Sequence, residues 1–204
     1  MGRKFMVGVA TLSALAALVL GLSACSTGGR TGGGGSVDNA PTAIKPGQVG
    51  FQEFSIGEAK ESNGIIINPV YFQAVDMEPK ETAGIGGEGD LHIEADIKAI
   101  KGNKTGFGMG EFVPYLKVDY TIESMTGGQE QKGTMMPMNA SDGPHYGANI
   151  KIGGAGQYKV TFVIQSPEKM AYLLHVDKTT GVSGRFWKKP LEVSWDWNYL
   201  PLKK

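Results

Sequence analysis

Apolar residues recur at every second position along four stretches of the chain, and these stretches are 91–99, 116–122, 158–164 and 191–199. A period of two is typical of strands with one buried face, because successive side chains of a strand point to opposite sides. An earlier apolar run, 65–75, predicts a further strand that Pro69 interrupts. Clusters of glycine, proline, asparagine and aspartate separate the runs, and no segment shows the period of an amphipathic helix.

This pattern predicts an all-β protein. Roughly seven strands, each with one apolar face, are what an antiparallel β-sandwich requires. Trp195 and Trp197 fall on the apolar side of the last run, so we expect both indoles in the core. Stacking against a carbohydrate or another ligand is the less favoured interpretation of the two tryptophans.

The first 24 residues have the features of an export signal. Arg3 and Lys4 precede an uncharged, mostly apolar run that ends in Leu22-Ser23-Ala24-Cys25. This ending resembles the bacterial lipoprotein lipobox, which implies cleavage before Cys25 and acylation of that cysteine, with palmitate among the acyl chains. An ordinary signal peptide followed by a chance cysteine is the alternative.

A change in composition marks the domain boundary. Glycine, serine, threonine and proline dominate the residues that follow Cys25, including an uninterrupted run at Gly32–Gly35. Such a composition is typical of a flexible tether. We therefore predict a signal peptide at 1–24, a lipidated cysteine and tether at 25–48, and one folded domain at 49–204.

Charge and composition exclude several classes of function. The 20 basic and 20 acidic side chains balance, and removal of the signal peptide would take away only Arg3 and Lys4. A nucleic-acid partner is not expected, because binding phosphates needs a basic face. The slightly acidic mature chain has no attraction for anionic lipids, so membrane attachment should come from the acyl chains alone. The single cysteine excludes a disulfide framework.

No pair of nucleophile and base stands out in the sequence. We therefore expect no enzyme and name no catalytic residue, and we look for binding chemistry instead. His92 and Glu94 are two residues apart on the polar side of one predicted strand, with Asp96 next in the same row. From spacing alone, a solvated strand face is the simpler interpretation of this row.

The remaining histidines and one methionine cluster add to the candidate chemistry. Met138 closes the sequence Met135-Met136-Pro137-Met138, which we expect just before a loop, and His145 follows in a turn-like segment. Thioethers suit copper, above all Cu(I), although core packing explains most methionines. The third histidine, His175, closes a short apolar run.

Taken together, six segments resemble the periplasmic proteins that work beside high-affinity iron permeases of the bacterial inner membrane. The lipobox and the glycine-rich tether are similar to those of membrane-anchored members of this group, of which many others are soluble. The segments follow the family order over most of residues 55–200, and they are 70–79, 90–97, 103–108, 113–116, 136–149 and 175–182.

The resemblance implies an immunoglobulin-like β-sandwich that forms a homodimer and binds metal near the dimer interface. Carried over by position, the metal ligands would be His92, Met138, His145 and His175, with Glu94 as a further or alternative ligand. Three imidazoles and a thioether suit copper, whereas imidazoles with a carboxylate also suit zinc, so the native metal stays open. Asp90 and Asp96 are nearby oxygen donors that would help to hold a harder ion such as iron.

We therefore expect a bacterial membrane lipoprotein, facing the periplasm or the cell surface, that assists iron acquisition. It would bind copper or zinc and pass on or redox-poise iron for a permease. One alternative is a zinc or copper buffer without a redox role. Another is a surface adhesin or antigen whose sandwich face binds a host protein.

Overall fold

The computed structural model describes residues 52–80, 89–128 and 130–202. Over these ranges, seven strands of eight to ten residues account for most of the fold, together with two short strands and one 3₁₀ helix. No helix in the described part of the chain is long and apolar enough to cross a membrane. The elements are β1 (Phe54–Ser55), β2 (Lys60–Ser62), β3 (Ile65–Gln73), β4 (Leu91–Ala99), β5 (Lys117–Ser124), β6 (Gln131–Ala140), β7 (Gly143–Ile150), β8 (Gly156–Gln165), η1 (Pro167–Met170) and β9 (Leu191–Tyr199).

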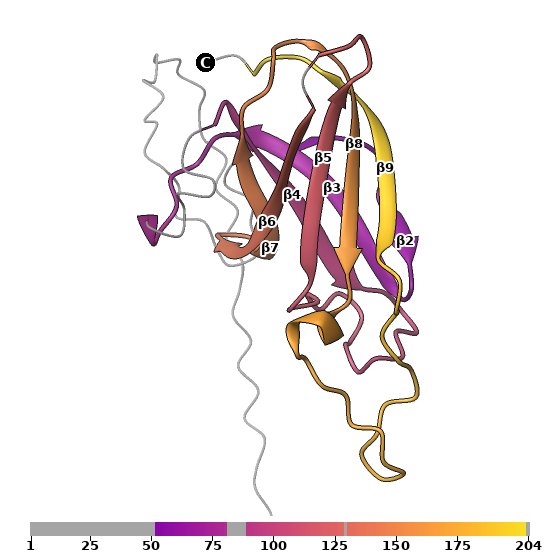
Figure 1. Ribbon diagram of the computed structural model, residues 1–204. Helices are drawn as coiled ribbons and strands as arrows, with labels where there is room; N and C mark the ends of the chain where they lie inside the picture. Colours follow the sequence, from indigo (N-terminus) through magenta and orange to yellow (C-terminus); the bar gives the residue numbers. More distant parts are fainter. Residues whose placement is uncertain (1–51, 81–88, 129, 203–204) are drawn as a thin grey trace, which may run out of the picture. The chain divides into compact units, whose positions relative to one another are not determined.

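The strands form two layers that share β6. Strands follow the hydrogen-bonded order β1-β3-β4-β7-β6-β5-β8-β9, β2 pairs with β3, and every pairing is antiparallel. The first half of β6, through Met135, pairs with β5, and the second half, from Met136, pairs with β7. Figure 1 shows β5, β8 and β9 side by side, with β3 and β4 behind them. The predicted antiparallel β-sandwich is confirmed.

Aromatic side chains join the two layers. Tyr71 of β3 meets Trp197 of β9 edge to face, with ring centroids 4.9 Å apart. Trp195 packs on Phe162 at 5.0 Å, and its indole N–H donates to the Glu58 carbonyl at 2.7 Å. Both tryptophans are buried, as expected from the alternating pattern. Full burial of a large apolar side chain stabilises a fold by about 1.5–3 kcal/mol.

Pro69 does not interrupt its strand, contrary to the prediction. It pairs with Ala95 inside a continuous β3–β4 ladder. The Pro69 carbonyl accepts from the Ile56 amide at 3.0 Å and so points away from β4. The missing N–H of Pro69 points the same way, into the gap between the pairings of β2 and β1, where no ladder hydrogen bond is lost.

The first half of strand β4 is buried on both faces. Its apolar set faces the core, and the residues are Leu91, Ile93, Ala95, Ile97 and Ala99. On the opposite face, His92 is 0% and Glu94 1% exposed. A solvated face is therefore the wrong interpretation of this row. The segment that follows β3, residues 74–79, lies over this end of β4 and encloses it.

Candidate metal centre

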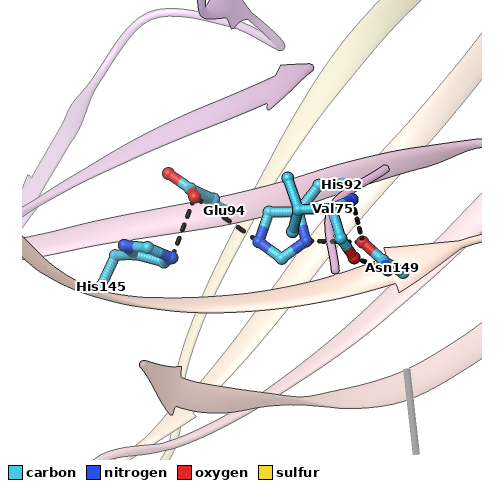
Figure 2. A network of polar contacts seen from close by, with 5 residues as sticks. All are labelled: Val75, His92, Glu94, His145 and Asn149. Atoms are coloured by element: carbon cyan, nitrogen blue, oxygen red, sulfur yellow. Dashed lines mark hydrogen bonds and ion pairs between the residues drawn. The ribbon is translucent and has the colours of Figure 1, made fainter. Parts of the chain in front are cut away.

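Two histidines and one glutamate converge on the outer face of the β4–β7 pair. Nε2 of His145 lies 2.9 Å from Oε1 of Glu94, and Nε2 of His92 lies 3.5 Å from the same oxygen. One ligand atom from each residue falls within 4.8 Å of the other two. Figure 2 shows both imidazoles turned toward the Glu94 carboxylate. All three side chains are almost completely buried.

The strand register places these side chains together. Glu94 of β4 pairs with Gly147 of β7, and His92 pairs with Asn149. His145 precedes Gly147 by two residues and therefore projects from the same face. Because Gly147 has no side chain, the space between the two imidazoles stays open.

A tight hairpin, and not a longer loop, connects the methionine cluster to His145. Strand β6 ends where Ala140 pairs with Gly143, whose φ of +138° favours glycine. Met138 lies inside β6 and pairs directly with His145 in β7. The turn comes at 141–142, so Met138 lies just before it as predicted, whereas His145 lies within the β7 ladder and not at a loop.

A cavity of about 610 Å³ opens onto the cluster. The sheet contributes His92, Glu94 and His145 to its lining, and residues 75–79 contribute the cover. Three methionines also line the cavity, and they are Met77, Met136 and Met138. Met135 points the other way, into the core, where it is 2% exposed. The donor set around one space is therefore imidazole nitrogen, carboxylate oxygen and thioether sulfur.

Burial and the neighbouring Glu94 shift the pKa values of the two histidines in opposite directions. It lowers the pKa of His92 to about 4, against the opposing effect of its hydrogen bond to Asn149, so this imidazole is neutral at pH 7. Burial also raises the pKa of Glu94, and His145 offsets part of that rise. For His145, burial acts to lower the pKa, but the interaction with Glu94 outweighs it and the pKa is raised. The protonation of Glu94 and that of His145 are therefore coupled through their 2.9 Å contact.

Further carboxylates surround the cluster. Burial, followed by the negative charges of Asp96, Glu94 and Asp142, raises the pKa of Glu53 to about 7. These carboxylates repel one another, and a cation bound among them would reduce that repulsion. Nothing in the residue order indicates a role for Glu53, because it lies far along the chain from the other acids.

The other predicted site residues lie elsewhere. His175 is exposed on the segment after η1, where its Nδ1 lies 2.9 Å from the Thr180 hydroxyl, and it is not part of the His92–Glu94–His145 cluster. Asp90 is exposed and accepts from the Ile152 amide at 3.0 Å. Asp96 is half-buried on the same face as Glu94. Cys25 lies outside the described residues.

The cluster fits a metal ion by its own chemistry. Nε2 of His92 is buried and has no hydrogen-bond partner among the described residues. A buried polar atom without a partner costs about 1–3 kcal/mol, and a bound cation would remove that cost. Neutral imidazoles, a carboxylate and a thioether suit copper, and the same set without the thioether suits zinc.

The fold and the cluster define this protein as an antiparallel β-sandwich that carries borderline and soft metal donors on one outer face. Its sequence defines the family more closely: residues 50–200 match the Fe2+ transport protein family, and the chain belongs to it. The predicted resemblance to iron-permease-associated proteins is thereby confirmed.

Individual relatives agree with this assignment. The chain is 45% identical over 195 residues to the 34 kDa membrane antigen of Treponema pallidum (strain Nichols), covering 94% of this chain and 96% of the relative. A copper-bound variant of FetP from uropathogenic Escherichia coli strain F11 is 48% identical with a TM-score of 0.70, over 76% of this chain and 96% of FetP. The copper-reconstituted P19 protein of Campylobacter jejuni is 41% identical with a TM-score of 0.69, over 76% of this chain and all (100%) of P19.

Proposed function

We propose that this protein is a lipid-anchored copper-binding protein of the bacterial envelope that assists iron acquisition, passing on or redox-poising iron for a permease. The observation that carries the proposal is the buried cluster of His92, Glu94 and His145 with Met138 beside it. The family description and the copper-bound structures of FetP and P19 support it. The protein is a carrier in this proposal and not an enzyme.

Each residue of the cluster has a distinct role in this proposal. His92 and His145 present Nε2 atoms, Glu94 adds a harder oxygen, and Met138 adds a soft sulfur that favours Cu(I). When bound, copper supplies a one-electron couple, which is the chemistry needed to change the oxidation state of iron. Zinc would fit the imidazoles and the carboxylate but would leave the protein a store without redox function.

Iron is the cargo in this proposal, and the surrounding acids suit it. Carboxylate oxygens are hard donors, and Asp96 lies two residues from Glu94 on the same strand face. Glu53 adds a further acidic group whose pKa responds to the same charges. These carboxylates are placed to attract a cation toward the cluster.

His175 would complete the site from a second copy of the chain. Within one chain it is exposed, and large apolar side chains near it are also exposed: Met170 by 50%, Leu173 by 85% and Val176 by 61%. A homodimer that buries this segment would hide the apolar groups and bring a third imidazole to the metal. We therefore expect the homodimer to form through this exposed apolar segment.

Anchoring through Cys25 is the part of the proposal that concerns location. Cys25→Ala should move the protein from the membrane fraction to the soluble fraction of its own cells. A cysteine-free protein that still partitions into detergent would show that the acyl chains are not the anchor.

Metal titration of the isolated domain tests the proposed function. His92→Ala and His145→Ala should each weaken binding of Cu(I), Cu(II) and Zn(II), because each removes an imidazole ligand. Asp90→Ala is a matched control, since Asp90 is close in sequence but its carboxylate accepts from the Ile152 amide and is not among the residues that line the cavity. If both histidine variants bind all three ions as tightly as wild type, the adhesin alternative becomes the better explanation.

A further inference from the structure

Asn149 is a buried polar residue outside the predicted ligand set. It is 6% exposed and pairs with His92 across the β4–β7 ladder, so the two side chains project side by side from one face. Its amide contacts both the His92 ring and the backbone of Val75, in the segment that covers the cavity. In Figure 2, dashed lines join the amide to the His92 ring and to the Val75 backbone.

Hydrogen bonds to the Val75 backbone fix the orientation of the Asn149 side-chain amide. The Val75 N–H donates to Oδ1 of Asn149 at 3.3 Å, and Nδ2 of Asn149 donates to the Val75 carbonyl at 2.8 Å. A flipped amide would set donor against donor and acceptor against acceptor at both contacts. The orientation of Asn149 is therefore determined by backbone atoms that cannot change their roles.

The fixed amide in turn fixes the tautomer of His92. Nδ1 of His92 lies 2.8 Å from Oδ1 of Asn149, and an amide oxygen only accepts. The proton of the neutral ring must therefore sit on Nδ1, which leaves a lone pair on Nε2. That nitrogen is the one that faces Glu94 across 3.5 Å. An orienting hydrogen bond on the far nitrogen is how a metal-binding histidine is held in its ligating form.

We propose that Asn149 is a positioning residue that presents Nε2 of His92 to the metal and couples metal binding to the cover segment 74–79. This inference rests on the proposed function of the cluster. The cover contributes Val75, Met77 and Pro79 to the cavity lining, and the paired hydrogen bonds of Asn149 hold it at Val75. A cation on Nε2 makes Nδ1–H a stronger donor, which tightens the bond to Asn149 and stabilises the cover.

Such a coupling is reciprocal. If metal binding stabilises the cover, then anything that loosens the cover must weaken metal binding by the same factor. A purely structural asparagine would not have this property, because its loss would lower stability without changing the His92 tautomer. The tautomer and the response of the cover to metal are therefore the readouts that separate the two roles.

The first measurement uses the metal-free wild-type domain. Nitrogen-15 NMR of the His92 ring should show the proton on Nδ1. A proton on Nε2 would overturn the proposal, and this result does not depend on whether the protein binds metal. In Asn149→Ala, the ring should become a mixture of tautomers.

The second measurement is hydrogen exchange at the Val75 amide, with and without saturating Zn(II). Zinc should slow exchange in wild type by about 5- to 150-fold, the usual range of coupling between two sites. Asn149→Ala should lose that response and bind Zn(II) about 10- to 100-fold more weakly. Asn103→Ala is the matched control, because Asn103 also ties two backbone segments together, at Gly64 and Thr105.

The outcomes separate the two proposals. A wild-type domain that binds no zinc or copper contradicts the proposed function, while the tautomer measurement still tests the role of Asn149. A wild-type domain that binds zinc without slowing Val75 exchange overturns the coupling and leaves the proposed function intact. Asn149→Ala with an unchanged tautomer and unchanged zinc response would reduce Asn149 to a structural residue.

Discussion

Gly147 lies directly against the ring of His92. A Cβ at position 147 would be 2.4 Å from Nε2 of His92 and 3.3 Å from Cδ2 of His145. Neither imidazole can yield easily, because both are buried. The absence of one methyl group on β7 is therefore a condition for the arrangement of the cluster.

Gly147→Ala should displace His92 and weaken Zn(II) and Cu(I) binding by more than about tenfold, while the overpacked sheet loses about 1–3 kcal/mol of stability. Metal titration and chemical denaturation measure the two effects. Gly153→Ala is the control, since the nearest atom to its Cβ would be the Tyr158 hydroxyl at 3.7 Å. Equal metal affinity in both alanine variants would show that the cluster does not need this space.

Met138→Leu should weaken binding of the soft ion Cu(I) but hardly change binding of the borderline ion Zn(II). Leucine keeps the volume of the side chain but removes the sulfur, so Cu(I) affinity should fall by at least about tenfold, the lower end of what changes around a metal site cause. Zn(II) affinity should hardly change, because zinc gains little from a thioether. Met135→Leu is the matched control, since Met135 faces the core from the same strand. Equal losses for both ions would contradict a ligand role for the sulfur.

Mixed dimers test whether His175 acts from the second copy. His175→Ala and His92→Ala should each bind copper weakly. When the two variants are refolded together, the heterodimer would contain one complete site, because the His92→Ala chain still supplies His175 to a partner with His92. Recovery of tight copper binding in the mixture is the expected result. No recovery, with dimers verified by sedimentation, would place His175 outside the site.

Glu53→Gln should change how stability depends on pH. The folded-state pKa of Glu53 is raised to about 7 from an ordinary value of 4.5, so the folded protein binds the extra proton between these values. The corresponding stability is present below pH 4.5 and is lost as the pH rises through 7. Relative to wild type, the glutamine variant should gain about 1 kcal/mol between pH 4.5 and 8, a value reduced for solvent screening. Parallel pH profiles for the two proteins, measured by urea denaturation, would contradict this.

The alternation along the chain was enough to predict the sandwich, because a strand with one buried face has apolar residues at every second position. It could not predict that the first half of β4 is buried on both faces. His92 and Glu94 occupy polar positions of a regular strand, and only the packing of residues 74–79 shows that water does not reach them. The prediction for Pro69 was wrong for a similar reason. Whether a proline interrupts a strand depends on whether a neighbouring strand needs a hydrogen bond from that position.

The resemblance located residues of the candidate site that spacing alone could not. Its segments include His92, Glu94, Met138 and His145, which the strands β4, β6 and β7 bring to one cavity. Asn149 also falls within a matched segment, but nothing in the sequence indicates that its amide reaches Val75. Glu53 had no signal at all, because its role depends on charges contributed by other segments. Whether these residues bind metal stays a prediction.

Strand β6 has an implication for how this family can vary in length. Its first half belongs to one layer and its second half to the other, and Met138 pairs with His145 just before the hairpin. Inserting or deleting a single residue between Met135 and Met138 would turn Met138 toward the opposite face relative to Met135 and shift the junction of the layers. Natural insertions should therefore accumulate elsewhere, for example at the Gly127-Gly128 turn, where added residues would leave both the ladder and the cavity in register.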